Sequence, residues 1–352
     1  MAYFEALLLI LGLILLVKGA DYFIKSAASI AKKLGISEFI IGLTLVALGT
    51  SIPELASSIV ASMKNATGII IGNVVGSNIA NIGLIIGVAA TIALIKTKKA
   101  MLNRDGYIML FVTGLFYLFM INGIISRIEA GIFLLLYIGY IIFLIEEKPE
   151  FEEYHFGHFL RYFLRFQYLI TIKSRIFSPK DKKKKEIPPA QKREMKELFK
   201  VGLIKDFLIV IIAGSAVVLG AKYLIESAIF FANLFNIPEN MIGLSIIAVG
   251  TSLPELMVSI SAARKGYGNI AIGNIIGSNI TNILLIIGVS GLILPISIIK
   301  STLYYTAPFM IFMSLLLLIF IRSYWSIRRI EGTIFLVLYA VFMTILFVNG
   351  II

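Results

Sequence analysis

Residues 49–54 read GTSIPE and residues 250–255 read GTSLPE, and each hexapeptide lies within a long apolar stretch. In the interior of a helix, proline costs about 3 kcal/mol and glycine about 1 kcal/mol. A carboxylate at the centre of a bilayer costs about 2.5 to 3.5 kcal/mol more. A helix that merely crosses a membrane needs none of these residues, so their repetition indicates a function for both turns.

The composition indicates an integral membrane protein. Of the 352 residues, 59% are hydrophobic and 15% are charged, which is outside the range of ordinary soluble domains. Apolar runs of about 20 residues recur without strand-like alternation, so the spans are predicted to be helices. The first run lacks a basic n-region and a cleavage site, which predicts a retained span. The absence of cysteine excludes disulfides, thiolate metal sites and cysteine nucleophiles.

The two hexapeptides belong to two copies of one sequence. A shift of 201 residues aligns IGLTLVALGTSIPEL (41–55) with IGLSIIAVGTSLPEL (242–256), and GNVVGSNIANI (72–82) with GNIIGSNITNI (273–283). Over the 52 positions from Ser37 to Val88, 30 residues are identical in the two copies. Shared apolar composition alone does not produce such agreement, so the chain contains a duplication.

Each half contains five predicted spans, so the fold is predicted to be all-α, with ten transmembrane helices in two five-helix repeats. Duplicated halves with an odd number of spans must have opposite orientations in the membrane, as in many secondary transporters. The first repeat is expected over 1–146 and the second over 202–352, on either side of a basic linker at 147–201. The spans of the first repeat are expected at about 4–32, 38–63, 68–95, 106–123 and 127–146.

The net charge of +12 is better explained by topology than by nucleic-acid binding. Most of the excess lies in the linker and in short tracts between spans, as the positive-inside rule predicts. With the linker in the cytoplasm, the basic tracts at 96–99 and 322–329 are also inside, and both termini are extracellular. The protein is therefore predicted to be a multi-pass protein of the cell membrane that contacts lipids and no nucleic acid. The sequence does not define its oligomeric state.

Two stretches of the linker each have two interpretations. HFLRYFLRFQYLITIKSRIF (158–177) interleaves aromatic residues with arginines, as an interfacial amphipathic helix does. A short juxtamembrane helix without a regulatory role fits equally well. EEKPEFEEYH (146–155) offers ligands for a regulatory cation, although a solvated charged turn is the simpler interpretation.

The hexapeptide offers oxygen ligands for a cation. Pro53 has no N–H, so the turn around Ala47 to Thr50 is predicted to have backbone oxygens without helical partners. Lipid tolerates such oxygens only where a cavity or a ligand takes them up. Thr50 and Ser51 add hydroxyl groups and Glu54 adds a carboxylate, which are ligands that calcium and sodium prefer. The second half offers the same set through Ala248, Thr251, Ser252 and Glu255.

The motif GNxxGSNIxN supplies a second polar surface. Asn73, Ser77 and Asn81 follow one another at i, i+4 spacing and therefore line one helix face. Gly72 and Gly76 have GxxxG spacing, which allows another helix to approach closely. Amides in membrane helices often serve only packing, but here the face accompanies a broken helix in both halves. The second half repeats the pattern with Asn274, Ser278 and Asn282 and with Gly273 and Gly277.

The acidic residues of the spans differ in their surroundings. Glu54 and Glu255 have no basic residue within a turn or two on their own helices, so no local ion pair neutralises them. Asp21 has Lys18 and Lys25 at i−3 and i+4, which predicts a neutralised structural or gating cluster. No HExxH or other zinc spacing occurs, so neither an enzyme nor a cofactor is predicted.

The paired hexapeptides and asparagine motifs resemble the two α-repeats of the cation/calcium exchanger superfamily, in particular those of prokaryotic sodium/calcium exchangers. The resemblance covers both halves. It implies ten helices, alternating access and a central diamond of cation sites, with Glu54 and Glu255 as shared carboxylates. It also implies backbone carbonyl ligands from Ala47, Thr50, Ala248 and Thr251, and sodium ligands from Ser51, Ser77, Asn81, Ser252 and Ser278.

Asn282 departs from part of that superfamily. Several relatives have an aspartate at this position, and the potassium-dependent branch uses an acid there. Because positions 81 and 282 are both asparagine, the only fixed charges in the implied site are those of Glu54 and Glu255. These two charges are enough to neutralise one calcium ion. The resemblance therefore implies exchange that does not depend on potassium, with Asn282 as the last of the predicted ion ligands.

The predicted function is that of a secondary antiporter that moves calcium outward against inward sodium. Calcium and sodium are its transported ions. A calcium/proton exchanger or another cation exchanger is the alternative within the class. A cation channel built on the same two acids is less favoured, because a channel needs no inverted pair of half-sites.

Overall fold

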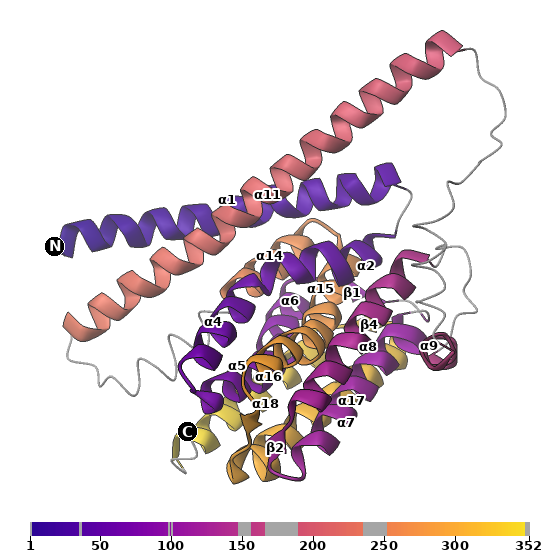
Figure 1. The fold of residues 1–352 in the computed structure, drawn as a ribbon. Helices are drawn as coiled ribbons and strands as arrows, with labels where there is room; N and C mark the ends of the chain where they lie inside the picture. The colour runs from indigo at the N-terminus through magenta and orange to yellow at the C-terminus, as the bar shows by residue number, and fades with distance from the viewer. Residues whose placement is uncertain are drawn as a thin grey trace.

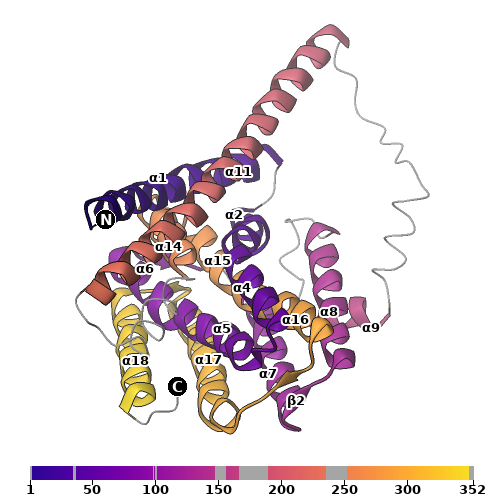
Figure 2. The same ribbon diagram turned by 60° about the vertical axis from the view of Figure 1, so that its left-hand side comes forward.

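The computed structural model shows a bundle of helices with two long helices, α1 and α11, crossing each other along one side (Figures 1 and 2). Helix α15 lies in the interior of the bundle, where most of its residues are buried. The structure describes residues 2–34, 37–97, 99, 101–146, 156–165, 189–234 and 252–348.

The first repeat consists of helices interrupted by short π-helical turns, labelled η. Its elements from the N-terminus are α1 (Ala2–Leu34), α2 (Glu38–Ile41), η1 (Gly42–Val46), α3 (Ala47–Thr50), α4 (Ile52–Met63), α5 (Thr67–Ala80), η2 (Asn81–Ile86) and α6 (Gly87–Ile92). They are followed by β1 (Ile95–Lys96), η3 (Met101–Gly106), α7 (Tyr107–Met120), β2 (Ile124–Ile125) and α8 (Arg127–Glu146).

The linker and the second repeat have the same character. The linker contributes α9 (Phe156–Leu164), and α11 (Pro189–Leu234) begins within the predicted linker. The remaining elements are α14 (Leu253–Arg264), α15 (Gly268–Thr281), η5 (Asn282–Ile287), α16 (Gly288–Ile293), β3 (Ile296–Ser297), η6 (Thr302–Thr306), α17 (Ala307–Tyr324), β4 (Ser326–Ile327) and α18 (Arg329–Val348).

Seven helices in the described ranges are long and apolar enough to cross a membrane. The bent pair Glu38–Thr50 and Ile52–Met63 adds an eighth crossing if it is one span. Of the other two predicted spans, 106–123 forms the 14-residue α7. The other is the span of the second half that corresponds to 38–63, and only its α14 segment lies in the described residues. A helical, multi-pass membrane protein is therefore confirmed, and the count of ten stays a prediction.

Two short antiparallel sheets join the repeats. β1 pairs with β4, where Ile95 lies opposite Ile327, and β2 pairs with β3, where Ile125 lies opposite Ile296. Because β1 and β2 flank the same helix α7, the two sheets lie at opposite ends of it. β1 and β3 are equivalent under the 201-residue shift, yet they belong to different sheets, as inverted repeats require.

Single cysteines in the two sheets are expected to react from opposite sides of the membrane. Ser326→Cys lies in the tract that is predicted to be cytoplasmic, and Ser297→Cys lies exposed in the other sheet. An impermeant maleimide should label only Ser297→Cys in intact cells and both variants after permeabilisation. The parent, which has no cysteine, is the control for background labelling. Labelling of both variants in intact cells would refute the odd-span topology.

Helix α15 approaches η1 and α2 of the other repeat at backbone distance. A Cβ atom at Gly273 would lie 2.4 Å from the Phe39 carbonyl oxygen, and one at Gly277 would lie 2.5 Å from the Leu43 carbonyl oxygen. The close approach predicted from this GxxxG spacing is therefore confirmed. For the glycines of the first half, the equivalent partner lies within 236–251, outside the described residues.

Gly273→Ala is expected to lower the unfolding temperature of the purified protein, because the added methyl group would force two backbones apart. Overpacking of this kind typically costs about 1 to 3 kcal/mol. Gly114→Ala in α7 is the matched control. A Cβ atom there meets nothing within 4 Å, and alanine is favoured over glycine in a helix by about 1 kcal/mol. Thermal unfolding in detergent measures both, and equal stability of the two variants would contradict the close approach.

Asp21 is neutralised by a residue of another helix. Its carboxylate accepts hydrogen bonds from Ser261 of α14, at 2.6 Å, and from Lys265, which follows α14. The carboxylate is neutralised as predicted, but its hydrogen-bonded partner is Lys265, which the packing of α14 on α1 brings to it, and not a lysine of α1. Near the end of α1, Lys33 pairs with Asp206 of α11 at 2.8 Å. Ion pairs thus tie α1 to two neighbouring helices.

The linker helix α9 packs its apolar face onto the bundle. Phe159 is fully buried and meets the rings of Tyr140 and Phe143 of α8 edge to face. Arg161 and Arg165 are exposed. A helix is therefore present over 156–164, and whether it is interfacial or juxtamembrane stays a matter of prediction. Residues 166–177 and the acidic residues 147–155 lie outside the described ranges.

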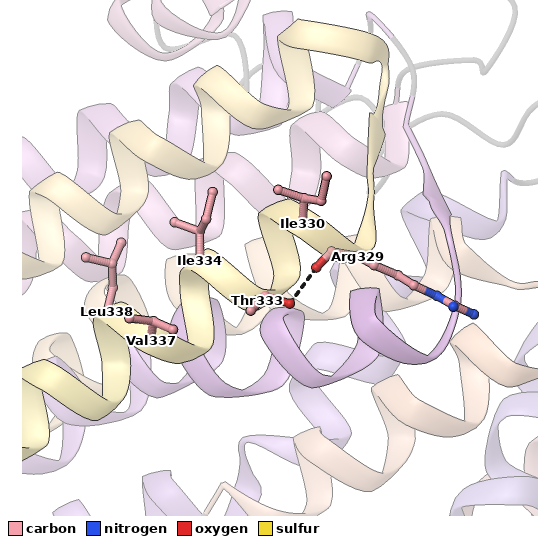
Figure 3. A pocket seen from close by; sticks show the side chains of 6 residues that line it. All are labelled: Arg329, Ile330, Thr333, Ile334, Val337 and Leu338. Atoms are coloured by element: carbon pink, nitrogen blue, oxygen red, sulfur yellow. Dashed lines mark hydrogen bonds between the residues drawn. The ribbon is translucent and has the colours of Figure 1, made fainter.

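The outer face of α18 carries a shallow apolar groove of about 440 Å³ (Figure 3). Ile330 in this groove is 68% exposed. The hydroxyl group of Thr333 donates to the Arg329 carbonyl oxygen at 2.9 Å, so it is satisfied within the helix. The groove therefore has an aliphatic surface with Arg329 at one end, and its lining residues provide no group of oxygen ligands for a cation. Its lining residues are Arg329, Ile330, Thr333, Ile334, Val337 and Leu338.

Candidate ion-binding site

The first hexapeptide breaks its helix at the predicted place. α3 ends at Thr50, Ser51 has φ −86° and ψ 7°, and α4 begins at Ile52. The two helices meet at 45°. Pro53 is tolerated because the first positions of a helix need no N–H donor. Glu54 follows in the first turn of α4 and is only 1% exposed.

The second hexapeptide has nearly the same conformation where it is described. Ser252 has φ −88° and ψ 4°, and α14 begins at Leu253 with Pro254 in its first turn. Glu255 is 1% exposed. The two halves therefore present one carboxylate each at the start of a helix, where the partial positive charge of the helix dipole favours a negative group.

The Ala47 carbonyl group is not freed by the break. It accepts the N–H of Ser51 at 3.0 Å and the hydroxyl group of Thr50 at 3.3 Å. Ala47 therefore keeps its helical partner, because the kink opens only after Thr50, and the unpartnered oxygen predicted for this turn must belong to a later residue. The carbonyl group that must lose its helical donor is that of Gly49, since Pro53, four residues later, has no N–H.

The predicted ligands lie in the interior of the bundle. Ala248 and Thr251 are outside the described residues, and each of the other ten is at most 4% exposed. Polar side chains are rarely buried so completely unless they have a structural or binding role. These ten are Ala47, Thr50, Ser51, Glu54, Ser77, Asn81, Ser252, Glu255, Ser278 and Asn282.

Serine side chains connect the two halves of this region. Ser51 Oγ lies 3.2 Å from both Glu255 Oε1 and Ser278 Oγ. Ser252 Oγ, its equivalent, lies 3.5 Å from Ser77 Oγ. The broken turn of each repeat therefore faces the asparagine helix of the other repeat, which brings both hexapeptides to one polar centre.

Four buried oxygen atoms at this centre have no hydrogen-bond partner in the described structure: Glu54 Oε2, Glu255 Oε2, Asn81 Oδ1 and Asn282 Oδ1. Buried polar atoms in folded proteins are almost always satisfied, and an unpaired buried charge is costly. All four atoms are acceptors when the carboxylates are ionised, and each repeat contributes two. Cations bind acceptors of this kind, so the four atoms make this centre a candidate cation site.

The donor set favours a hard cation. Among the described residues, no three His, Cys, Asp or Glu side chains gather at one place. The centre instead combines two carboxylates with amide and hydroxyl oxygens. Calcium and sodium prefer such oxygen ligands, whereas transition metals favour nitrogen and sulfur.

The first asparagine of each motif bonds to the glutamate helix of its own repeat, and Asn274 Oδ1 also accepts from Thr50 Oγ1 of the other repeat at 3.2 Å. Asn73 Nδ2 donates to the Glu54 carbonyl oxygen at 3.1 Å and to Ser58 Oγ at 2.9 Å. Asn274 Nδ2 donates to Ser259 Oγ at 3.1 Å. These amides join each asparagine helix to the glutamate helix of its own repeat.

Two further asparagines at the centre were not predicted as site residues. Asn78 Oδ1 accepts from Asn282 Nδ2 at 3.0 Å, and Asn279 Oδ1 accepts from Asn81 Nδ2 at 2.9 Å. Asn78 and Asn279 are each 1% exposed. Their sequence signal is the GSN tripeptide, which is identical in both halves.

A helical membrane bundle whose two repeats share a buried, oxygen-lined centre defines a transporter of cations. The family described as sodium/calcium exchanger protein matches residues 4–146 and again residues 205–348. The chain belongs to this family and is a cation exchanger of the membrane.

Relatives match nearly the whole chain. It is 53% identical over 342 residues to sodium/calcium exchanger MaX1 of Methanosarcina acetivorans, an alignment that covers 97% of this chain and 98% of that protein. It is 33% identical over 288 residues to inner membrane protein YrbG of Escherichia coli, covering 82% of this chain and 79% of that one. A solved structure of the sodium-calcium exchanger NCX_Mj matches with a TM-score of 0.75 and 30% identity, covering 98% and 100% of the two chains.

Proposed function

We propose that this chain is a secondary antiporter that exchanges sodium for calcium by alternating access. The observation that carries the proposal is the set of four unpartnered oxygens, contributed equally by the two repeats. With both carboxylates ionised, the centre holds two negative charges, which one calcium ion neutralises. The position of the centre between inverted repeats supports access from one side at a time.

Charge compensation explains why the exchange is coupled. Glu54 and Glu255 are too costly to leave as bare carboxylates inside the membrane. A change between outward-open and inward-open states is therefore favoured when calcium, or sodium ions in its place, occupy the centre. The protein without bound ions would seldom change between the two states. Inward movement of sodium therefore drives calcium outward.

The relatives support the same choice of ions. MaX1 is named a sodium/calcium exchanger, and NCX_Mj structures were obtained with sodium together with calcium or strontium. Asparagine at 282 favours exchange without potassium, because no third carboxylate is present to hold an additional charge. A calcium/proton exchanger is the second candidate, favoured only by the possibility that a buried carboxylate carries a proton instead of sodium.

Calcium uptake into proteoliposomes tests the proposal. Vesicles loaded with sodium and diluted into sodium-free buffer should accumulate calcium, and vesicles loaded with potassium should not. Adding potassium to the sodium-loaded vesicles should leave the rate unchanged. Uptake driven by a pH gradient without sodium would establish the proton exchanger instead, and single-channel currents would establish a channel.

We also propose the membrane and the orientation in which the protein works. The basic linker would lie in the cytoplasm, both termini would be extracellular, and the protein would reside in the cell membrane. Lipid chains would cover the aliphatic face of α18 that Figure 3 shows. Neither nucleic acid nor a cofactor takes part in this mechanism, since transported ions alone satisfy the centre.

A further inference from the structure

Asn78 of α5 and Asn279 of α15 bind each other at the interface of the two repeats. They are equivalent under the 201-residue shift. Asn78 Nδ2 donates to the Asn279 carbonyl oxygen at 3.3 Å, and Asn279 Nδ2 lies 3.5 Å from the Asn78 carbonyl oxygen. The pair therefore forms a reciprocal contact between the two asparagine helices, which we name the asparagine clasp.

The clasp uses its remaining oxygens to hold two of the predicted ion ligands. Asn78 Oδ1 accepts from Asn282 Nδ2 at 3.0 Å, and Asn279 Oδ1 accepts from Asn81 Nδ2 at 2.9 Å. Both bonds cross from one repeat to the other. Asn81 and Asn282 each begin a π-helical turn, a distortion that is frequent at functional sites.

These bonds decide which atom of each ligand amide can meet a cation. An asparagine side chain ends in an oxygen acceptor and an N–H donor of similar size, so an unrestrained amide could present either end. Only the oxygen binds a cation. Because the clasp holds the Nδ2 atoms of Asn81 and Asn282, their Oδ1 atoms are the ends left buried without a partner.

We infer that Asn78 and Asn279 are positioning residues of the ion site, each of which fixes the amide of one ion ligand in the opposite repeat. The inference rests on the proposed function, since it takes Asn81 and Asn282 to bind the transported ions. Neither clasp residue contacts the ion. Each acts by keeping a donor away from it.

The inference predicts an effect on calcium affinity. Asn78→Ala would release the amide of Asn282, which could then turn its N–H donor toward the cation. Loss of such a supporting partner typically weakens metal affinity about 10- to 100-fold. The half-saturating calcium concentration of exchange should rise by about tenfold or more, while calcium at saturation should restore much of the maximal flux.

A double-mutant cycle separates positioning from a structural role. With Asn282→Asp, both terminal atoms at this position are oxygens, so its orientation no longer decides whether an oxygen faces the ion. Asn78→Ala should then weaken calcium affinity far less than it does in the parent. Asn78 makes no hydrogen bond to the side chain of Asn81. In a protein that carries Asn81→Asp, Asn78→Ala should therefore weaken calcium affinity as much as it does in the parent.

The other half of the clasp supplies the matched control. Asn279→Ala should weaken calcium affinity much less in a protein that carries Asn81→Asp. In a protein that carries Asn282→Asp, it should weaken calcium affinity as much as in the parent. This half also tests the inference if Asn78→Ala does not fold. Equal losses of affinity in all three backgrounds would show a merely structural role and overturn the inference.

Direct calcium binding distinguishes this inference from the proposed function. Calcium-dependent thermal stabilisation of the detergent-solubilised protein measures binding without any need for transport. A parent that is not stabilised by calcium would overturn the proposed function and the inference with it. A parent that is stabilised, together with an Asn78→Ala variant of unchanged calcium affinity, would overturn the inference alone. Ser314→Ala, which removes a buried hydroxyl bonded only within α17, should leave calcium affinity unchanged.

Discussion

Glu54→Gln is expected to abolish calcium exchange and to leave a folded protein that, without ions, unfolds at a higher temperature than the parent. The expected loss of flux exceeds about a hundredfold, since even supporting residues of metal sites contribute 10- to 100-fold. Glutamine keeps the volume of glutamate but removes one of the two charges that calcium needs. The same substitution removes a buried carboxyl group that no basic side chain in the described structure neutralises, so the ion-free protein no longer bears the cost of burying it. Glu255→Gln is expected to behave in the same way.

Two measurements check this result. Calcium uptake into sodium-loaded vesicles reports the flux, and thermal unfolding with and without calcium reports stability and binding. Glu226→Gln, whose side chain is 57% exposed on α11, is the matched control and should resemble the parent in both. If purified Glu54→Gln took up calcium at the parent's rate under a sodium gradient, Glu54 would not be part of the ion site.

Asn282→Asp is expected to make calcium exchange dependent on pH and sensitive to potassium. The new carboxyl group would lie with Glu54 and Glu255 in one buried centre, so it keeps its proton more readily than an exposed carboxyl group. Its protonated form can also replace the hydrogen bond to Asn78 Oδ1 that the amide now makes. As pH rises, the group loses its proton, and the added charge binds cations more tightly. The ionised variant holds three negative charges against one calcium ion, which favours an additional monovalent ion.

Calcium uptake measured across a pH series, with and without potassium, checks this prediction. The calcium affinity of the variant should rise with pH more steeply than that of the parent, and only the variant should respond to potassium. Asn122→Asp, which adds the same charge at an exposed position between α7 and β2, should follow the parent. Identical pH and potassium responses of Asn282→Asp and the parent would show that position 282 does not face the ions.

The hexapeptides made the broken helix and its buried carboxylate predictable, because proline removes a donor wherever it stands. The repeat likewise made the burial of Ser77 and Ser278 predictable, since helical spacing places them on the face that carries Asn81 and Asn282. These inferences depend on local geometry. They need no knowledge of which helix packs on which.

Interactions between distant helices were not predictable in this way. The spacing of charges on α1 suggested local partners for Asp21, but Lys265 neutralises it from 244 positions away. Asn78 and Asn279 are not predictable from the helix face that carries Ser77 and Asn81, because that face describes only one repeat at a time. Their bonds run between repeats, and no periodicity within one helix reveals them.

The two short sheets make the halves of this chain mutually incomplete. Each sheet takes one strand from either repeat, so a half on its own would leave the edge of every strand without a hydrogen-bond partner. The first and second halves are therefore joined by backbone hydrogen bonds as well as by the linker. These pairings lie at opposite ends of α7, so we expect the two halves to stay associated when the linker is cut.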